Sequence, residues 1–309
     1  MYNTCKMFRY PCIPMRYLII LLFISLHISG CFSRWVMTEK EIDAYYAGRP
    51  KPVFFTIQND SVKLFCATTG SDTLPALLLI HGAPGAWYGS RTMLDDTVLQ
   101  KKFHMISVDR LGYDKSRFHN KKRAVTSIEM QAIAIEEALR LNRSRQKAVV
   151  LGSSYGGPIA LQVALHHPEK FYHVFLLAPA IDPDKEKFWW FHRYIRRGPV
   201  HWFMPRFLKT ATDEKFAHVK ELRKLQSLWK NLSVPATVVQ GGSDKIVDPS
   251  NLEFAKKQLQ GKDAEFIYLP GAGHMLRFGQ SKLIREILLK AVDSTTSGTI
   301  SNVKNEKTL

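Results

Sequence analysis

Short apolar runs alternate with longer amphipathic segments over most of the chain. The best-marked helical segment spans residues 126–141, where Thr126 and Glu129 have capping-box spacing and apolar side chains recur on one face. Eight apolar runs have the length and composition of strands: Val53–Ile57, Val62–Ala67, Ala76–Ile80, His104–Val108, Ala148–Leu151, Val174–Ala178, Ala236–Gln240 and Ala264–Leu269. The first two predict an antiparallel pair. The alternation that follows predicts an α/β fold, a mostly parallel eight-stranded sheet flanked by helices.

One interval between predicted strands is much longer than a crossover requires. Residues 181–231 contain several aromatic side chains, including Trp189 and Trp190, and twelve Lys or Arg against six Asp or Glu. We interpret this interval as an inserted helical cap. Two roles fit its composition: it faces an anionic membrane surface or an acyl chain, or its aromatic side chains pack the cap onto the core while its charges are solvated.

The overall composition excludes a disordered chain and narrows the choice of partner. The 309 residues are 45% apolar, which suffices for a large core, and the formal net charge is +17. Such a charge favours anionic partners. The sequence has no zinc-ligand spacing, no phosphate-binding glycine loop and no basic repeat interleaved with aromatic residues, so we expect neither nucleic acid nor metal to bind.

The N-terminus has the organisation of an export signal. Lys6, Arg9 and Arg16 precede an apolar run over residues 17–28, and small residues follow. A membrane-spanning helix needs about 20 apolar residues. This run is shorter, so cleavage is expected, and an uncleaved signal anchor is the alternative.

The end of this run, Ile28-Ser29-Gly30-Cys31, resembles the lipobox of bacterial lipoproteins. The resemblance implies that Cys31 is lipidated and holds the protein in the cell envelope, at the outer membrane or its periplasmic face where there are two membranes. The predicted organisation is a signal peptide over 1–30, a tether over 31–52, a core over 53–180 and 232–292, a cap over 181–231 and a disordered tail over 293–309.

A serine nucleophile is indicated where the fifth predicted strand ends. The motif Gly152-x-Ser154-x-Gly156 is typical of a tight strand-to-helix turn that exposes a serine and leaves no room for side chains beside it. With Ser153 as nucleophile, leucine and tyrosine would replace the two glycines. Ser154 is therefore the candidate.

Two further side chains follow predicted strands at the same sheet edge. His274 lies in a glycine-rich turn after the last predicted strand, and Asp244 follows the seventh. Asp248 competes as the acid, but it precedes a proline and has the position of a helix N-cap. Asp182, after the sixth strand, is a further candidate. Because the carboxyl ends of parallel strands meet at one edge, we expect Ser154, Asp244 and His274 to meet there.

Three motifs, together with the histidine turn, give the chain a family resemblance. They are His81–Gly85 (HGAPG), Asp109–Ser116 (DRLGYDKS) and Gly152–Gly157 (GSSYGG). From about residue 53 to 292 the chain resembles α/β-hydrolase fold proteins with a serine nucleophile. The resemblance implies a Ser154, Asp244 and His274 triad in that order, with backbone N–H groups of Ala83 and Tyr155 as oxyanion donors, and no cofactor.

The resemblance also favours one reaction. Ser154 departs from the aspartate of haloalkane dehalogenases and epoxide hydrolases, and Ala83 departs from the HGGPG motif of prolyl aminopeptidases. We therefore expect hydrolysis of a small-molecule or lipid ester, or of an amide, with Trp87 and Tyr88 beside Trp189 and Trp190 in the substrate pocket. The alternatives are an aminopeptidase-like or carbon–carbon bond hydrolase with the same triad, and a non-catalytic envelope lipoprotein that binds a lipid or protein partner.

Overall fold

The computed structural model describes residues 36–119, 124–188 and 204–296, which fall into two compact units divided between Ala47 and Gly48. The described part of the first unit contains helix α2 (Glu39–Tyr45). Thr38 and Glu41 form a reciprocal capping box at its N-terminus, with the Thr38 N–H donating to the Glu41 carboxylate at 2.7 Å. The sequence analysis expected an irregular tether here. The capping-box spacing was present in the sequence and marks the helix start.

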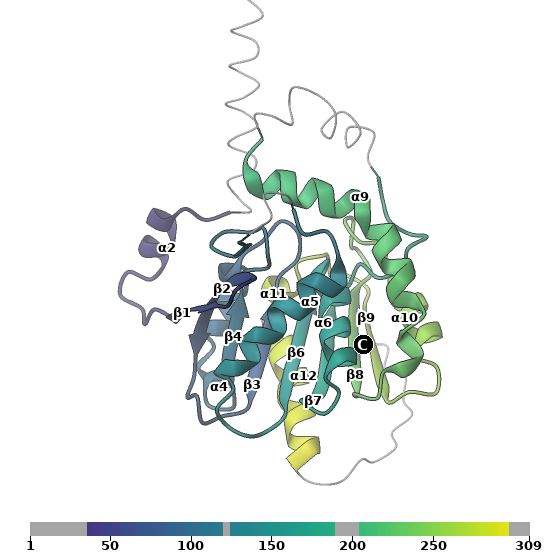
Figure 1. The fold of residues 1–309 in the computed structure, drawn as a ribbon. Coiled ribbons are helices and arrows are strands. Elements are labelled where there is room, and N and C mark those ends of the chain that lie inside the picture. Colours follow the sequence, from purple (N-terminus) through teal and green to yellow (C-terminus); the bar gives the residue numbers. More distant parts are fainter. Residues whose placement is uncertain (1–35, 120–123, 189–203, 297–309) are drawn as a thin grey trace, which may run out of the picture. The chain divides into compact units, whose positions relative to one another are not determined.

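The second unit is built on one mixed sheet (Figure 1). Its strands are β1 (Val53–Gln58), β2 (Val62–Thr69), β3 (Ala76–Ile80), β4 (His104–Val108), β5 (Arg117–Phe118), β6 (Ala148–Ser153), β7 (Phe171–Leu177), β8 (Ala236–Gly241) and β9 (Ala264–Leu269). The order across the sheet is β1-β2-β4-β3-β6-β7-β8-β9, with β5 paired to β2. All pairs from β4 to β9 are parallel, whereas β2 pairs antiparallel with β1, β4 and β5.

The predicted fold class is confirmed, with two corrections. The described residues form nine strands instead of eight, because the two-residue β5 pairs with the start of β2 and is too short to show an alternating pattern. Helix α5 (Ile128–Glu136) is capped by Ser127, whose side chain accepts from the Met130 N–H, and not by Thr126. Neighbouring Ser and Thr both suit an N-cap, so sequence spacing alone cannot separate them.

Helices cover both faces of this sheet. In Figure 1, α5 and α6 (Gly156–His166) lie in front of the sheet and α12 (Ser281–Thr296) lies behind it. The remaining helical elements are η1 (Trp87–Ser90), α3 (Arg91–Leu94), α4 (Thr97–Gln100), η2 (Glu137–Leu141), α9 (Arg206–Gln226), η3 (Trp229–Asn231), α10 (Asn251–Gln258) and α11 (Leu276–Gly279). Helix α12 extends the ordered chain four residues into the segment expected to be a tail.

The core is the apolar layer between the sheet and these helices. The central strands β3 and β4 are buried along their whole length, because a parallel strand is covered on both faces. Buried side chains of α6, such as Ile159 and Leu161, belong to the same cluster as the sheet. The C-terminal half of α9 joins it through Leu222 and Leu225.

Helix α9 is the described helix of the predicted cap. It crosses above the sheet in Figure 1, and its side chains contact the loop that follows β4. Trp189 and Trp190 lie outside the described residues, as do Cys31 and the predicted signal peptide. In the part of the chain that the structure describes, no helix combines the length and apolar character needed to cross a membrane.

Candidate active site

Ser154 lies on a strained turn between β6 and α6. Its φ is +54°, a left-handed conformation that costs a non-glycine residue free energy and is concentrated at functional sites. The surrounding backbone holds the turn: the Ser154 N–H donates to the carbonyl of Leu177 at 2.9 Å, and the Ser154 carbonyl accepts from the N–H groups of Gly157 and Ala180. The strain is therefore fixed by hydrogen bonds to two neighbouring segments.

The two glycines of the motif are required by close packing. A Cβ at Gly152 would collide with the carbonyl of Gly156. A Cβ at Gly156 would lie 2.6 Å from the carbonyl oxygens of both Ile80 and His81. Helix α6 can thus begin directly against the end of β3, and this contact sets Ser154 beside the loop that follows β3.

That loop brings unpaired N–H donors to the serine. A Cβ at Gly82 would lie 3.0 Å from Cβ of Ser154, so the two segments are in contact. Ala83 follows Gly82, and Tyr155 follows Ser154 at the start of α6. Neither N–H group donates a hydrogen bond to another residue in the described segments. Two free backbone donors beside a serine can stabilise a developing oxyanion.

His274 and Asp244 form a buried pair. Nδ1 of His274 lies 2.7 Å from Oδ2 of Asp244, whose side chain is fully buried. Two loops dock to bring them together: the Ser243 N–H donates to the carbonyl of Ala272, and Gly241 lies so close to the second loop that a Cβ there would clash with it. Because a carboxylate only accepts, Nδ1 of His274 carries the proton and Nε2 is left as an acceptor.

Asp244 stays ionised despite its burial. Burial raises the pKa of this carboxyl group, but the hydrogen bond and charge of His274 and the N–H groups of Val247 and Ile246 together lower it more, so the net pKa lies below its usual value. The two N–H groups donate at 2.9 and 2.8 Å. The carboxylate is therefore available to orient the imidazole and to stabilise it when it is charged.

Neither of the two competing acids is hydrogen-bonded to His274 in the described residues. Asp248 accepts from the Ser250 N–H at 3.1 Å and pairs with Lys187 at 3.2 Å, in the turn that leads into α10. The carboxylate of Asp182 accepts from the Asp184 N–H. Among the described residues, the hydrogen-bonded acid of His274 is Asp244, and no hydrogen bond joins His274 to Ser154.

A pocket of about 100 Å³ opens at Ser154. Ala83, Ser154 and Tyr155 line it from the core, and Lys215 and His218 line it from α9 of the cap. The candidate nucleophile and both candidate oxyanion donors therefore share one cavity with cap side chains. No cluster of three metal-ligating side chains occurs in the described part of the chain.

Comparisons with known proteins agree on the architecture. Residues 75–218 match the family model of the alpha/beta hydrolase fold. The crystal structure of a membrane phospholipase A, described as a bacterial virulence factor, superposes with a TM-score of 0.62 over 91% of this chain and 98% of that one, at 17% sequence identity. The chain has the α/β-hydrolase fold.

Curated relatives with this fold match only part of the chain. Epoxide hydrolase 1 of Caenorhabditis elegans is 30% identical over 115 residues, which are 37% of this chain and 27% of the relative. The AB hydrolase superfamily protein YfhM of Bacillus subtilis (strain 168) is 26% identical over 156 residues, 50% of this chain and 49% of the relative. The chain thus spans between about a quarter and a half of these relatives.

Trp87 and Tyr88 do not lie where the sequence analysis expected them. Their side chains are 1% and 4% exposed, and neither lines the pocket at Ser154. The N–H of Trp87 donates to Asp109 at 2.8 Å, and its ring packs against Phe54 at 5.1 Å between centroids. They follow the loop after β3 that contains Gly82 and Ala83, which we call the oxyanion loop. The turn of η1 directs their side chains into the core of the α/β-hydrolase fold.

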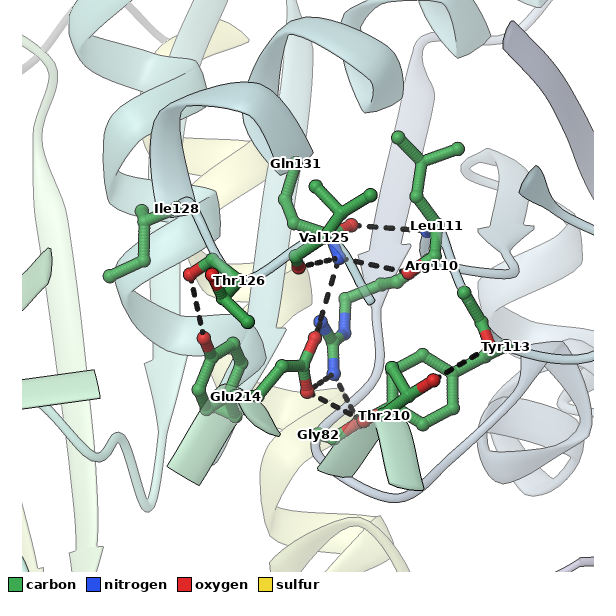
Figure 2. A network of polar contacts seen from close by, with 12 residues as sticks. Gly82, Arg110, Leu111, Tyr113, Val125, Thr126, Ile128, Gln131, Thr210 and Glu214 are labelled. Carbon is green, nitrogen blue, oxygen red and sulfur yellow. Dashed lines mark hydrogen bonds and ion pairs between the residues drawn. The ribbon is translucent and has the colours of Figure 1, made fainter. Parts of the chain in front are cut away.

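Arg110 and Glu214 join the oxyanion loop to the cap (Figure 2). Their ion pair is bidentate, with N–O distances of 2.6 and 3.0 Å, and both side chains are fully buried. Arg110 also donates to the carbonyl of Gly82 at 3.1 Å, while Glu214 accepts from Tyr113 and Gln131. Burial lowers the pKa of Arg110, but the Glu214 carboxylate, together with Tyr113 and Tyr155, outweighs burial and the net pKa is raised. The guanidinium therefore stays charged.

His81 completes the support of this loop. Burial and the charge of Arg110 hold the pKa of His81 well below its usual value, so the ring is neutral. Its Nδ1 lies 2.7 Å from the carbonyl of Gly82, and its Nε2 accepts from the N–H of Arg110 at 3.0 Å. Both nitrogens are used, which leaves His81 in a structural role.

The segment predicted as a cap contributes residues that were not candidates from the sequence. Glu186, Lys215 and His218 line the pocket, and Glu214 anchors α9, yet none was a candidate. The available signal was the spacing of Glu214, His218 and Glu221, which lie on one helical stripe. Such a stripe ordinarily marks a solvated face, and only the structure shows that the core covers it.

Proposed function

We propose that this protein is a serine hydrolase that cleaves ester bonds through an acyl-enzyme intermediate. One observation carries the proposal: the strained Ser154 lies in a pocket also lined by Ala83 and Tyr155, whose backbone N–H groups donate to no other described residue. The buried pair of His274 and Asp244, on loops at the same sheet edge, supplies a base. The fold alone would not select this activity.

The proposed reaction has two steps, acylation of Ser154 and hydrolysis of the acyl-enzyme, and the same residues act in both. Nε2 of His274 takes the proton of Ser154 as Oγ attacks the ester carbonyl, and the N–H groups of Ala83 and Tyr155 stabilise the oxyanion. Asp244 stabilises the imidazolium through Nδ1. The alcohol leaves with the proton from Nε2, and water repeats the sequence to release the acid. The step requires His274 to approach Ser154 when substrate binds, as catalytic hydrogen bonds commonly do.

The nucleophile favours esters over epoxides, the substrates in the name of the C. elegans relative. If Ser154 opened an epoxide, it would form an ether, which has no carbonyl at which water could release the product. A serine ester does have one. The name of the phospholipase A with the same fold also concerns an ester hydrolase.

The pocket argues against an amine-bearing substrate. A cationic amine needs a free carboxylate, and the carboxylates of Glu186 and Asp248 at the pocket are paired with Lys215 and Lys187. The aminopeptidase-like alternative therefore lacks an obvious anchor for the amine. A neutral ester fits these paired charges.

A fluorophosphonate probe tests the nucleophile directly. Wild type should be labelled at Ser154, whereas Ser154→Ala should not be labelled and should lose at least about 10³-fold in kcat/KM on p-nitrophenyl esters. Ser153→Ala is the matched control and should keep its labelling. Equal labelling of wild type and Ser154→Ala would overturn the assignment, and faster turnover of aminoacyl amides than of esters would favour the amide alternative.

For location, we propose that Cys31 carries a lipid anchor in the cell envelope, on the strength of the sequence Ile28-Ser29-Gly30-Cys31. Cys31→Ser should release the protein from the membrane fraction. Cys66→Ser, which changes a buried thiol of the core, is the control and should leave the fractionation unchanged. A Cys31→Ser protein that stays bound with an uncleaved N-terminus would favour the signal-anchor alternative.

A further inference from the structure

The buried face of α9 begins as a row of polar side chains. Thr210, Glu214, His218 and Glu221 are all at most 8% exposed. Three of them bond to the core: Thr210 donates to the carbonyl of Gly112, Glu214 binds Arg110, and Glu221 accepts from the N–H that begins α5. The fourth, His218, keeps one nitrogen without a partner. Among the buried side-chain nitrogen and oxygen atoms of α9, Nε2 of His218 is the one without a hydrogen bond to the described residues.

The surroundings of His218 decide which proton it carries. Nδ1 lies 3.0 Å from Oε2 of Glu186, and Lys215 pairs with the other oxygen of the same carboxylate. Burial, followed by the charge of Lys215, lowers the pKa of His218 to about 3, so the ring is neutral at physiological pH. The carboxylate only accepts, hence the single ring proton is on Nδ1. Nε2 is therefore an acceptor.

His218 belongs to the same pocket as the candidate nucleophile. Its ring packs on the ring of Tyr155, with centroids 4.4 Å apart, and both residues line the pocket with Ser154. A buried acceptor without a donor lowers the stability of the folded protein. A ligand that donated a hydrogen bond to Nε2 inside the pocket would recover this cost.

The charges at the pocket select a neutral donor. An anionic group would meet the lone pair of Nε2 rather than a proton. A cationic group would meet the ammonium of Lys215, beside Lys185 and Lys187, while the nearby carboxylates are already paired with two of these lysines. A hydroxyl group donates without a charge.

We propose that Nε2 of His218 accepts a hydrogen bond from a hydroxyl group of the ester substrate, so that this site prefers hydroxyl-bearing esters to their deoxy analogues. The proposal deepens the proposed function and rests on it. Sites built to bond a substrate hydroxyl reject the analogue that lacks it, because their own polar group is then left unpaired. His218 is thus a specificity residue supplied by the cap.

Matched substrates test the proposal in the wild-type protein. One arm compares p-nitrophenyl 3-hydroxybutanoate with p-nitrophenyl butanoate, and the other compares glycerol monobutyrate with propyl butyrate. The two arms distinguish a hydroxyl in the acyl part from one in the alcohol part. We expect kcat/KM to be at least about tenfold higher for the hydroxyl-bearing ester in one arm. Ratios near one in both arms would mean that water satisfies Nε2, and would overturn the proposal.

Substitutions of His218 test whether its Nε2 causes the preference for hydroxyl-bearing esters. His218→Phe keeps an aromatic ring against Tyr155 but removes the acceptor, and should bring the ratio near one by lowering kcat/KM more for the hydroxyl-bearing ester than for the deoxy ester. His218→Gln restores an acceptor oxygen and should recover part of the ratio. The control is His173→Phe, at a half-buried histidine that bonds Thr237 away from the pocket, and it should keep the full ratio.

Fluorophosphonate labelling separates failure of this proposal from failure of the proposed function. A His218→Phe protein that is labelled at Ser154 and keeps the wild-type ratio would overturn the role of His218 alone. Absence of labelling in wild type would instead remove the nucleophile and both proposals. If His218→Phe does not fold, the kcat/KM ratios of the substrate pairs in wild type and in His218→Gln test the proposal instead.

Discussion

Two helices border the proposed active site, and they are held in different ways. Helix α6 carries the Ser154 turn and is packed on the sheet by apolar side chains and by glycines that let backbones touch. Helix α9 lies over the same site, and its inner face is polar from Thr210 to Glu221 before it turns apolar at Leu222. Hydrophobic packing is strong but non-directional, whereas a buried ion pair fixes one register.

This difference suggests a division of labour. The Ser154 turn leads into α6, whose buried side chains belong to the core cluster, whereas α9 is positioned by directed contacts such as the one from Glu214 to Arg110. Because that arginine also holds the carbonyl of Gly82, the position of the cap and the shape of the oxyanion loop depend on the same side chain. Breaking the contact between Glu214 and Arg110 should therefore also change the catalytic rate.

The largest effect should come from breaking the buried ion pair. Glu214→Leu leaves the guanidinium of Arg110 buried without its carboxylate, and should reduce the free energy of unfolding by about 4 kcal/mol in urea titrations. The double variant Arg110→Met with Glu214→Leu should recover much of this loss, because no charge is then buried. Its kcat/KM should be below that of wild type, since the Gly82 carbonyl has lost one of its two donors and keeps only Nδ1 of His81. A double variant as unstable as Glu214→Leu would contradict the charge argument.

Removing apolar contacts from α6 should have a somewhat smaller effect. Ile159→Ala deletes a fully buried side chain and should cost about 3 kcal/mol in the same titrations. Unlike the ion pair, this loss has no partner substitution on α9 that would restore it. The exposed Ile133→Ala on α5 is the control and should change stability by less than about 0.5 kcal/mol. Equal losses at the two sites would mean that α6 is not packed as described.

Much of the α6 side of the site was predictable, and the α9 side was not. Strand and turn residues around Gly152 and Ser154 carry local signals, and the turn at His274 carries another. Glu214 and His218 carry only their helical spacing, which resembles that of a solvated helix face. The partner of Glu214 lies 104 residues earlier in the chain. Only the tertiary fold shows that these polar groups are covered.

Closeness in sequence led to a wrong position for two side chains, Trp87 and Tyr88. Trp87 and Tyr88 follow the oxyanion loop directly, which made them candidates for the pocket. The direction of their side chains depends on a single turn of η1, and that turn points them into the core. Proximity along a loop therefore predicts the neighbourhood of a side chain but not the side of the sheet edge on which it lies.

Substitutions on α9 and α6 should also differ in how they change the pH dependence of stability. The pKa of His218 is lowered to about 3, while an unfolded histidine has a pKa of about 6.5. Between these values the unfolded chain binds a proton that the folded chain does not, so stability falls as the pH falls from about 6.5 toward about 3. The slope for one proton is about 1.4 kcal/mol per pH unit. His218→Phe should reduce the measured slope by this amount, whereas Ile159→Ala should lower stability at every pH without changing the slope.

The smallest effect should come from the outer face of α9. Arg223 pairs with Asp184 at 2.6 Å, but the two side chains are 56% and 69% exposed. Water screens such a pair and two flexible side chains lose entropy to form it, so Arg223→Ala should change the free energy of unfolding by about 0.5 kcal/mol or less. Repeating the measurement at 1 M salt should remove even this difference. A loss near that of Glu214→Leu would mean that charge as such, and not its burial against Arg110, holds the cap in place.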